Sequence, residues 1–178
     1  MTNTQPSRAK AETLIYHVVK SPIGRLILAS DGIALVGVWM ANASPTDANW
    51  SRLEGDDDIL AQARQELEEY FDGRRRTFDV PLAPNGTEFQ LSVWSALTTI
   101  PFGTTISYAD LARRVGNEAA VRAVGAANGR NPIPVIVPCH RVIGSDGSLT
   151  GFGGGLPRKK WLLQHEGALP VGQVELAV

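Results

Sequence analysis

The sequence contains a single cysteine, Cys139, among its 178 residues. A lone thiol excludes a disulfide framework and any cysteine-rich zinc module. A long apolar run is also lacking, since the longest, residues 33–41, falls far short of the ~20 residues that a membrane span needs. Residues 1–11 are polar and have no apolar core, which predicts a loose tail rather than a secretory signal. We therefore expect a cytoplasmic, globular protein with no membrane partner.

Charge of neither sign dominates the chain, which has 17 Lys and Arg against 18 Asp and Glu. Between residues 106 and 161, however, 8 basic side chains face 3 acidic ones, a net charge of 8 − 3 = +5. DNA or another polyanion would therefore meet the second half of the chain, because the local field governs its approach. Helices of near-neutral proteins also scatter their charges in this way, so charge alone leaves the partner open.

The first half of the chain predicts a small sheet. Residues 13–19 are apolar and β-branched, and residues 21–24 have the composition of a turn. Two further apolar runs, residues 25–30 and 33–39, flank the pair Asp31-Gly32. An Asp-Gly pair between apolar runs predicts a two-residue hairpin loop in which both residues adopt positive φ.

Helix starts and stops are well marked in the rest of the chain. Apolar residues recur at helical spacing from Asp58 until Gly73 ends the predicted helix. Thr87 is followed three residues later by a glutamine and Ser107 by an aspartate, so both predict helix N-termini with capping boxes.

A short, bare helix is predicted after the one that begins at Ser107. Asn117 is expected to cap it, and residues 118–128 are nearly all alanine and glycine around one long cation, Arg122. Two short helices joined by a tight turn have helix-turn-helix shape. A helix that reads bases in the major groove would carry several polar side chains, whereas a bare helix permits the close approach that a minor groove needs. The alternative, which composition alone slightly favours, is an interior helix with Arg122 paired at the surface.

Chemistry is indicated by residues 131–142. Their three prolines predict an extended, stiff segment whose apolar residues 135–137 lie in the core, and which presents Cys139 followed by His140. A thiol needs a base or a positive field to become a nucleophile, and His140 and Arg141 could supply these. Neighbouring side chains of an extended segment point to opposite faces, so the pair would need a bend or a bridging water. The alternative is a cysteine that packs as a small buried hydrophobe.

Two features downstream point to the same site. Residues 144–155 are rich in glycine, which lets a backbone approach a ligand closely or simply forms a surface loop. The helix that follows is predicted to end at Gly167, and Glu166 lies in its last turn, where the helix dipole disfavours a carboxylate. Glu166 is therefore expected to have a specific partner, with His140 the first candidate.

Together these residues resemble the O6-alkylguanine-DNA alkyltransferases. The residues that carry the resemblance are Pro138-Cys139-His140-Arg141-Val142, Ile106-Ser107-Tyr108, Arg122-Ala123-Val124-Gly125, Asn131-Pro132 and Leu162-Leu163-Gln164-His165-Glu166-Gly167. The resemblance covers residues 86–178 and implies an α+β fold. Residues 1–85 would form an α/β domain with a three-stranded sheet and a ribonuclease H-like motif. Residues 86–178 would form a mainly helical DNA-binding domain with a winged-helix-like helix-turn-helix.

The function implied by this resemblance is DNA repair. A monomer would bind double-stranded DNA through its minor groove, flip out an O6-alkylguanine and move the alkyl group irreversibly to Cys139, once per molecule. Activity on O4-alkylthymine stays open, and no cofactor or metal is expected. The implied catalytic residues are Cys139, His140, Glu166 and Asn131. The implied substrate-binding residues are Tyr108, Val142, Phe152, Gly153 and Pro134. The implied DNA-binding residues are Arg122, Ala120, Ala123 and Gly125.

Each implied catalytic residue has a definite role. His140 would deprotonate Cys139 through a water, Glu166 would orient the imidazole, and Asn131 would tie the helix-turn-helix to the active-site segment. Arg122 would fill the stack that the flipped nucleotide leaves.

The sequence departs from the family at residues 152–153, since many members have Tyr-Ser where this chain has Phe152-Gly153. Phenylalanine keeps an apolar wall but lacks the hydroxyl, and Gly153 keeps a backbone N–H donor. Two other functions compete with alkyl transfer. One is a helix-turn-helix regulator with Cys139 as a redox switch, against which the bare helix argues. The other is a Cys-His hydrolase, although such enzymes usually separate the two residues in sequence.

Overall fold

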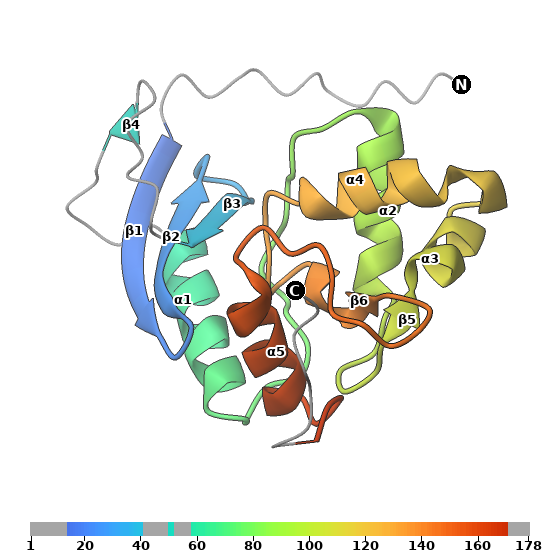
Figure 1. Ribbon diagram of the computed structural model, residues 1–178. Helices are drawn as coiled ribbons and strands as arrows, with labels where there is room; N and C mark the ends of the chain where they lie inside the picture. Colours follow the sequence, from blue (N-terminus) through green and yellow to red (C-terminus); the bar gives the residue numbers. More distant parts are fainter. Residues whose placement is uncertain (1–13, 41–49, 52–57, 171–178) are drawn as a thin grey trace, which may run out of the picture.

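A sheet with one helix and a cluster of short helices make up the computed structural model, which describes residues 14–40, 50–51 and 58–170 (Figure 1). The tail predicted for residues 1–11 lies outside these ranges. None of the helices within them has the length and hydropathy of a membrane span. The mixed α+β class that the sequence predicts is confirmed.

The sheet belongs to the first half of the chain. Strands β1 (Leu14–Ser21), β2 (Gly24–Ser30) and β3 (Leu35–Met40) are antiparallel, as predicted. A two-residue strand, β4 (Trp50–Ser51), pairs parallel with β1 and gives the order β3-β2-β1-β4. The sequence did not indicate β4, because two residues are too few to show an alternating pattern.

The two-residue hairpin loop predicted at Asp31-Gly32 is wrong. The loop has four residues, because β3 begins only at Leu35. The Asp31 carboxylate accepts hydrogen bonds from the amides of Ile33 and Ala34, and Gly32 is the only residue of the loop with positive φ. An aspartate side chain that binds the backbone two or three residues later closes its own turn, so it needs no left-handed conformation itself.

Helix α1 (Asp58–Phe71) covers one face of the sheet, and it is followed by Gly73 with φ +74°, as predicted (Figure 1). Its buried face consists of Leu60, Ala63, Glu66, Leu67 and Tyr70. The helix contacts β1 and β2. Removal of this apolar surface from water is the main force that holds helix and sheet together.

The two predicted capping boxes are confirmed. Helix α2 (Glu88–Thr98) is capped by Thr87 together with Gln90, and α3 (Tyr108–Arg114) by Ser107 together with Asp110. Each box satisfies two backbone N–H groups that would otherwise lack partners. The buried residues of α2 are Val93, Trp94 and Leu97, whereas Phe89 is 37% exposed.

The helix predicted over residues 118–128 begins differently. A 3-10 turn, η1 (Glu118–Ala120), precedes helix α4 (Val121–Gly129), and the Asn117 side chain makes no capping bond to any described residue. The predicted Asn117 cap is therefore wrong. The tight pairing of α3 with α4 is present, as is a short parallel ladder between β5 (Ile106–Ser107) and β6 (Val142–Ile143).

The extended segment predicted after Asn131 is also wrong. Val135 has φ +76°, and its neighbour Val137 donates its N–H to the carbonyl of Ile133, so the chain turns back on itself. Proline fixes only its own φ, at a value that turns use as readily as extended chain. Residues 135–137 are nevertheless buried as predicted, and the 3-10 turn η2 (Cys139–Arg141) follows directly.

The open edge of the sheet holds this active-site segment. Strand β3 is an edge strand, and its Val38 N–H donates to the carbonyl of Pro132 at 2.8 Å. Leu35 of the same strand bonds to Pro81 and Ala83. An unpaired strand edge is thus covered by the segment around residues 81–83 and by Pro132 of the second half. Helix α5 (Leu156–His165), with Pro157 in its first turn and Gly167 after its end, completes the fold.

Candidate active site

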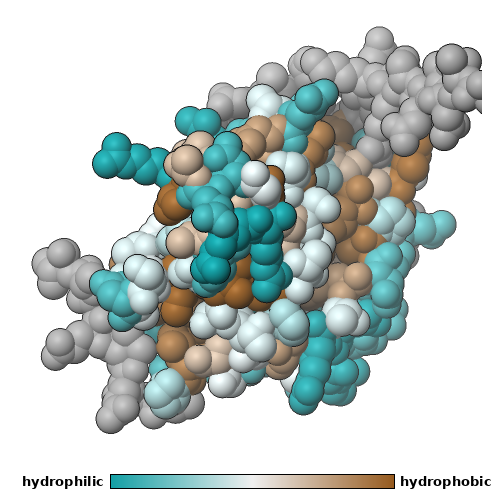
Figure 2. All heavy atoms as spheres, turned by 90° about the vertical axis from the view of Figure 1, so that its right-hand side faces the viewer, coloured by the Kyte–Doolittle hydropathy of each residue, from teal (hydrophilic) through white to brown (hydrophobic). Residues whose placement is uncertain are grey.

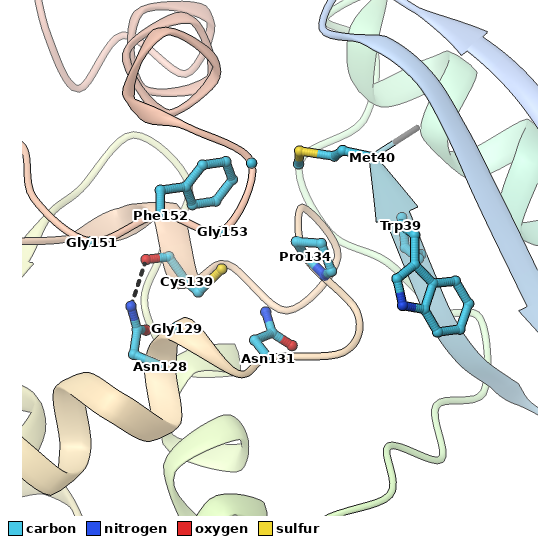
Figure 3. A pocket seen from close by; sticks show the side chains of 12 residues that line it. Trp39, Met40, Asn128, Gly129, Asn131, Pro134, Cys139, Gly151, Phe152 and Gly153 are labelled. Atoms are coloured by element: carbon cyan, nitrogen blue, oxygen red, sulfur yellow. Dashed lines mark hydrogen bonds between the residues drawn. The ribbon is translucent and has the colours of Figure 1, made fainter. Parts of the chain in front are cut away.

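Cys139 lies in the wall of a cavity of about 270 Å³ between the sheet edge and the second half of the chain. Figure 3 shows its sulfur pointing into this cavity, with Phe152 on one side and Pro134 and Met40 across from it. The lining residues are Val38, Trp39, Met40, Asn128, Gly129, Asn131, Pro134, Cys139, Gly151, Phe152, Gly153 and Gly154. Within the described residues, no three His, Cys, Asp or Glu side chains are grouped to hold a metal ion.

The thiol of Cys139 is poorly hydrated, since the residue is only 4% exposed. Burial raises the pKa of this thiol, whereas the Asn131 amide and the positive charge of Lys159 act in the opposite direction. A thiolate is the reactive form, and burial in apolar surroundings disfavours it. A nearby proton acceptor is therefore required if Cys139 is to react near neutral pH.

His140 and Glu166 form a hydrogen-bonded pair behind Cys139, as the sequence predicts. The imidazole Nε2 lies 2.8 Å from Glu166 Oε1, and both side chains are inaccessible to solvent. Since the carboxylate can only accept, Nε2 carries the proton. Burial lowers the pKa of His140 despite the carboxylate, so the ring is neutral near neutral pH. Its buried Nδ1 has no partner among the described residues, which leaves a lone pair available as a base.

Glu166 is also held by partners that the sequence did not indicate. Arg141 donates from Nε to Oε2 at 2.8 Å and from a terminal nitrogen to Oε1 at 3.0 Å. The Tyr70 hydroxyl donates to Oε1 at 2.7 Å. Burial alone would raise the pKa of Glu166, but hydrogen bonds and charges from His140 and Arg141 hold it far below its usual range. Glu166 is thus ionised throughout the pH range of interest.

Two asparagines shape the cysteine segment. Asn131 donates to the carbonyl of Val137 at 2.8 Å and accepts from the N–H of Ile133 at 3.0 Å, so it closes the turn that precedes Cys139. Asn128, at the end of α4, donates to the carbonyl of Cys139 at 3.4 Å. The sequence analysis did not single out Asn128. The usable signal is a polar amide in an alanine-rich helix, because such a side chain needs hydrogen-bond partners if the helix buries it.

The glycine-rich loop lines one side of the cavity, and Tyr108 packs against that loop without lining the cavity itself. The Tyr108 hydroxyl donates to the carbonyl of Thr150 at 3.0 Å, and Gly125 of α4 lies against its ring. Phe152 and Gly153 line the cavity as part of this loop. Val142, by contrast, is fully buried behind the cavity and does not line it.

The sheet contributes a wall that the sequence could not indicate. Met40, the last residue of β3, and Trp39 both line the cavity. A Cβ at Gly154 would clash with the sulfur of Met40, so this position accepts only glycine while Met40 stays in place. Nothing in the local sequence pattern connects β3 with a loop so much later in the chain.

Helix α4 presents a bare face to solvent beside the cavity. Arg122 and Ala123 are exposed, whereas Ala120 and Gly125 are half-buried. Figure 2 views the side of the molecule on which α3 and α4 lie, and hydrophilic side chains gather near the centre of that face. The exposed arginines of α3, α4 and the turn after α4 are Arg113, Arg114, Arg122 and Arg130. The interior alternative for this helix is therefore wrong.

A buried cation, Lys159, lies close to Cys139. Its ammonium group donates to the carbonyls of Val142 and Thr150, each at 2.6 Å, and the side chain is fully buried. Burial lowers the pKa of Lys159 to about 8, while the neighbouring Cys139 favours its charged form. The lysine therefore supplies positive charge to the thiolate up to mildly alkaline pH.

Lys159→Met is expected to raise the pKa of Cys139 and to lower the free energy of unfolding by about 2 kcal/mol, because two buried carbonyls lose a charged donor. Thiolate absorbance against pH and denaturant unfolding measure the two effects. Lys160→Met is the matched control, since it removes the same charge from the same helix without touching those carbonyls. Equal effects of both substitutions would contradict the assigned contacts.

Two family models match the chain and together cover most of it. Residues 14–84 match the ribonuclease-like domain of 6-O-methylguanine DNA methyltransferase. Residues 88–168 match the DNA-binding domain of the same family.

Curated relatives and solved structures agree with these matches. A methylated-DNA–protein-cysteine methyltransferase of Methanosarcina acetivorans is 47% identical over 87% of this chain and 99% of its own length. One of Mycobacterium tuberculosis is 47% identical over 85% and 91%. The crystal structure of Mycobacterium tuberculosis OGT in complex with DNA is 45% identical, with a TM-score of 0.79 over 88% of this chain and 93% of that one.

Proposed function

The chain belongs to the 6-O-methylguanine DNA methyltransferase family, and we propose that it repairs duplex DNA by transferring an alkyl group from O6 of guanine to Cys139. One observation carries the proposal for the site. The single thiol of the chain points into a cavity of about 270 Å³, with a buried His140–Glu166 pair directly behind it.

The damaged nucleotide must leave the DNA stack to reach this thiol. Extrusion of a nucleotide costs a few kcal/mol, and Cys139 lies in a cavity that a duplex cannot enter. The bare face of α4 suits close approach to the minor groove, where Arg122 occupies the gap in the stack. The positively charged second half binds phosphates without reading sequence, which suits a lesion that can occur at any guanine.

Transfer is a displacement at the alkyl carbon. The thiol proton passes through a water to Nδ1 of His140, and the thiolate attacks the carbon bound to O6. The S–C bond forms as the C–O6 bond breaks, and the electron pair of the broken bond stays on the guanine. The Tyr108 hydroxyl at N3 and the Gly153 N–H at O6 stabilise that charge until guanine takes up a proton. Across the whole reaction, the protein loses one proton and guanine gains one.

The reaction occurs once per molecule. Its product is a thioether, which water does not cleave, so Cys139 stays alkylated. Repair is thus stoichiometric, and the amount of protein limits the number of lesions removed.

We further propose that the residues divide between two domains and that one chain suffices. Residues 1–85 hold the sheet and α1, and residues 86–178 hold α2 to α5 with the cavity face that carries Cys139. The cavity and the His140–Glu166 pair are both formed within one chain, so the proposed site needs no residue of a second copy.

Intact-mass analysis tests the proposed function. After incubation with a duplex that contains O6-methylguanine, the protein is expected to gain one CH2, located on the Cys139 peptide, while the DNA loses an equal amount of lesion. An acyl-transferring hydrolase or a DNA-binding regulator would leave both masses unchanged. An unchanged protein mass with the lesion still in the DNA therefore refutes alkyl transfer.

A further inference from the structure

Among the residues of the first half that the structure describes, Tyr70 is the one whose side chain hydrogen-bonds to the active-site carboxylate. This residue lies near the end of α1, is fully buried, and donates its hydroxyl proton to Glu166 Oε1 at 2.7 Å. Its ring is fixed by edge contacts to Phe102 and His165, with centroids 6.1 and 5.1 Å away. The hydroxyl is therefore held at the carboxylate by rigid packing on several sides.

The oxygen that Tyr70 binds is the one that also holds the imidazole. Glu166 Oε1 accepts from Tyr70, from His140 at 2.8 Å and from Arg141 at 3.0 Å. The other oxygen accepts from Arg141 at 2.8 Å and from the N–H of Gly103 at 3.3 Å. Arg141 alone could hold both oxygens as a fork, in a geometry set by the guanidinium rather than by the imidazole. The hydrogen bond from Tyr70 holds Glu166 Oε1 in the position where it also accepts from His140.

We propose that Tyr70 is a positioning residue for alkyl transfer, through which the first half of the chain keeps Glu166 directed at His140. The proposal rests on the proposed function and gives residues 1–85 a part in it. Tyr70 acts through Glu166 and touches neither the alkyl group nor the base.

The direction of the effect follows from the charges that surround the pair. His140 and Arg141 come from η2, Tyr70 from α1, and Lys159 and His165 from α5. The Glu166 carboxylate raises the pKa of His140, whereas burial, Arg141 and Lys159 lower it. Without the Tyr70 hydroxyl, the carboxylate turns toward Arg141 and its hold on the imidazole weakens. His140 then becomes a weaker base, and the thiolate of Cys139 forms at higher pH.

Tyr70→Phe is the decisive variant, because it removes one oxygen and keeps the packed ring. The substrate is free O6-benzylguanine, so that DNA binding does not enter the measured rate. Rates are taken from about pH 5.5 to about pH 9.5, which brackets the titration of imidazole and thiol. We expect transfer at neutral pH to slow by about three- to tenfold, as for loss of one hydrogen bond, and the rise of rate with pH to move to higher pH.

Phe78→Leu is the matched control, since Phe78 packs against the Tyr70 ring at 5.4 Å between centroids and has no polar group that could donate a hydrogen bond to Glu166. This variant is expected to lower the unfolding temperature and to keep the wild-type pH profile. Thermal unfolding of each variant confirms that it is folded at the assay temperature.

Each outcome of this comparison has one meaning. A Tyr70→Phe protein with the rate and pH profile of the wild type overturns the positioning role. A Tyr70→Phe protein that reacts more slowly but keeps the wild-type pH profile also overturns the positioning role. Loss of ring packing alone would produce that result, and Phe78→Leu shows how large such an effect is. If the wild-type protein gains no CH2 on Cys139 from the O6-methylguanine duplex, the proposed function has failed and the role of Tyr70 fails with it.

Discussion

Cys139→Ser is expected to abolish alkyl transfer, with a fall in rate of at least about a thousandfold, while the variant still binds lesion-containing DNA. A serine hydroxyl is a far weaker acid than a thiol, and the neutral His140 behind it is too weak a base to ionise it. The buried carboxylate holds His140 in the tautomer that accepts at Nδ1, but this cannot replace the nucleophilicity of sulfur. The measurement is the mass of the protein after excess O6-methylguanine duplex.

Folding and binding serve as controls for this variant. The new hydroxyl fits in the volume of the thiol and has the Asn131 amide beside it. The free energy of unfolding should therefore change by about 1 kcal/mol or less. Binding to a lesion duplex should stay within about threefold of wild type, because the phosphate contacts are unchanged. A Cys139→Ser protein that still gained a CH2 would mean that another side chain accepts the alkyl group.

The parts of the fold that local chemistry determines could be predicted from the sequence. The capping boxes at Thr87 and Ser107 need only residues three positions apart, and both are present. The contact between Glu166 and His140 was predicted because a carboxylate at a helix C-terminus is electrostatically out of place. In both cases the signal was a local conflict or a local pairing visible without tertiary structure.

Errors arose where one local signal allowed two conformations. Prolines near Asn131 exclude helix, but they permit a turn as well as a strand, and Val135 adopts the left-handed conformation. The Asp31-Gly32 pair allowed both a two-residue hairpin and a longer loop closed by the aspartate side chain. Tertiary contacts decide between such options, as the bond from β3 to Pro132 does for the active-site segment.

Two partners that the sequence did not indicate, Tyr70 and Met40, come from distant parts of the chain. In the sequence pattern, Tyr70 is only one of the apolar positions of α1, and Met40 is only the end of a strand. Only the packing of the sheet against the second half brings Tyr70 to Glu166 and Met40 to Gly154. Burial of a hydroxyl beside a charge has no signature in a hydrophobic pattern, because the pattern records periodicity and not the partner.

Arg122→Ala is expected to slow repair of O6-methylguanine in duplex DNA by about tenfold or more and to leave the reaction with free O6-benzylguanine nearly unchanged. Arg122 is the long side chain on the exposed, bare face of α4, and it has no ion-pair partner among the described residues. A side chain that fills the gap in the stack offsets part of the cost of nucleotide extrusion. Free base needs no extrusion, so its rate reports the chemistry at Cys139 alone.

Arg130→Ala separates this role from simple attraction to phosphates. Arg130 is also exposed and directly follows α4, so its loss removes one positive charge from the same surface. Each substitution should reduce the salt dependence of binding by up to about one phosphate contact. Only Arg122→Ala should in addition slow the reaction when the duplex is saturated with protein. At saturation the rate no longer depends on the affinity for DNA, but it still depends on the free energy needed to extrude the nucleotide. Equal slowing of both variants under saturation would show that Arg122 contributes charge and nothing more. Equal slowing of Arg122→Ala on duplex and on free base would show that the substitution disturbs the chemistry at Cys139, which also contradicts the proposed role.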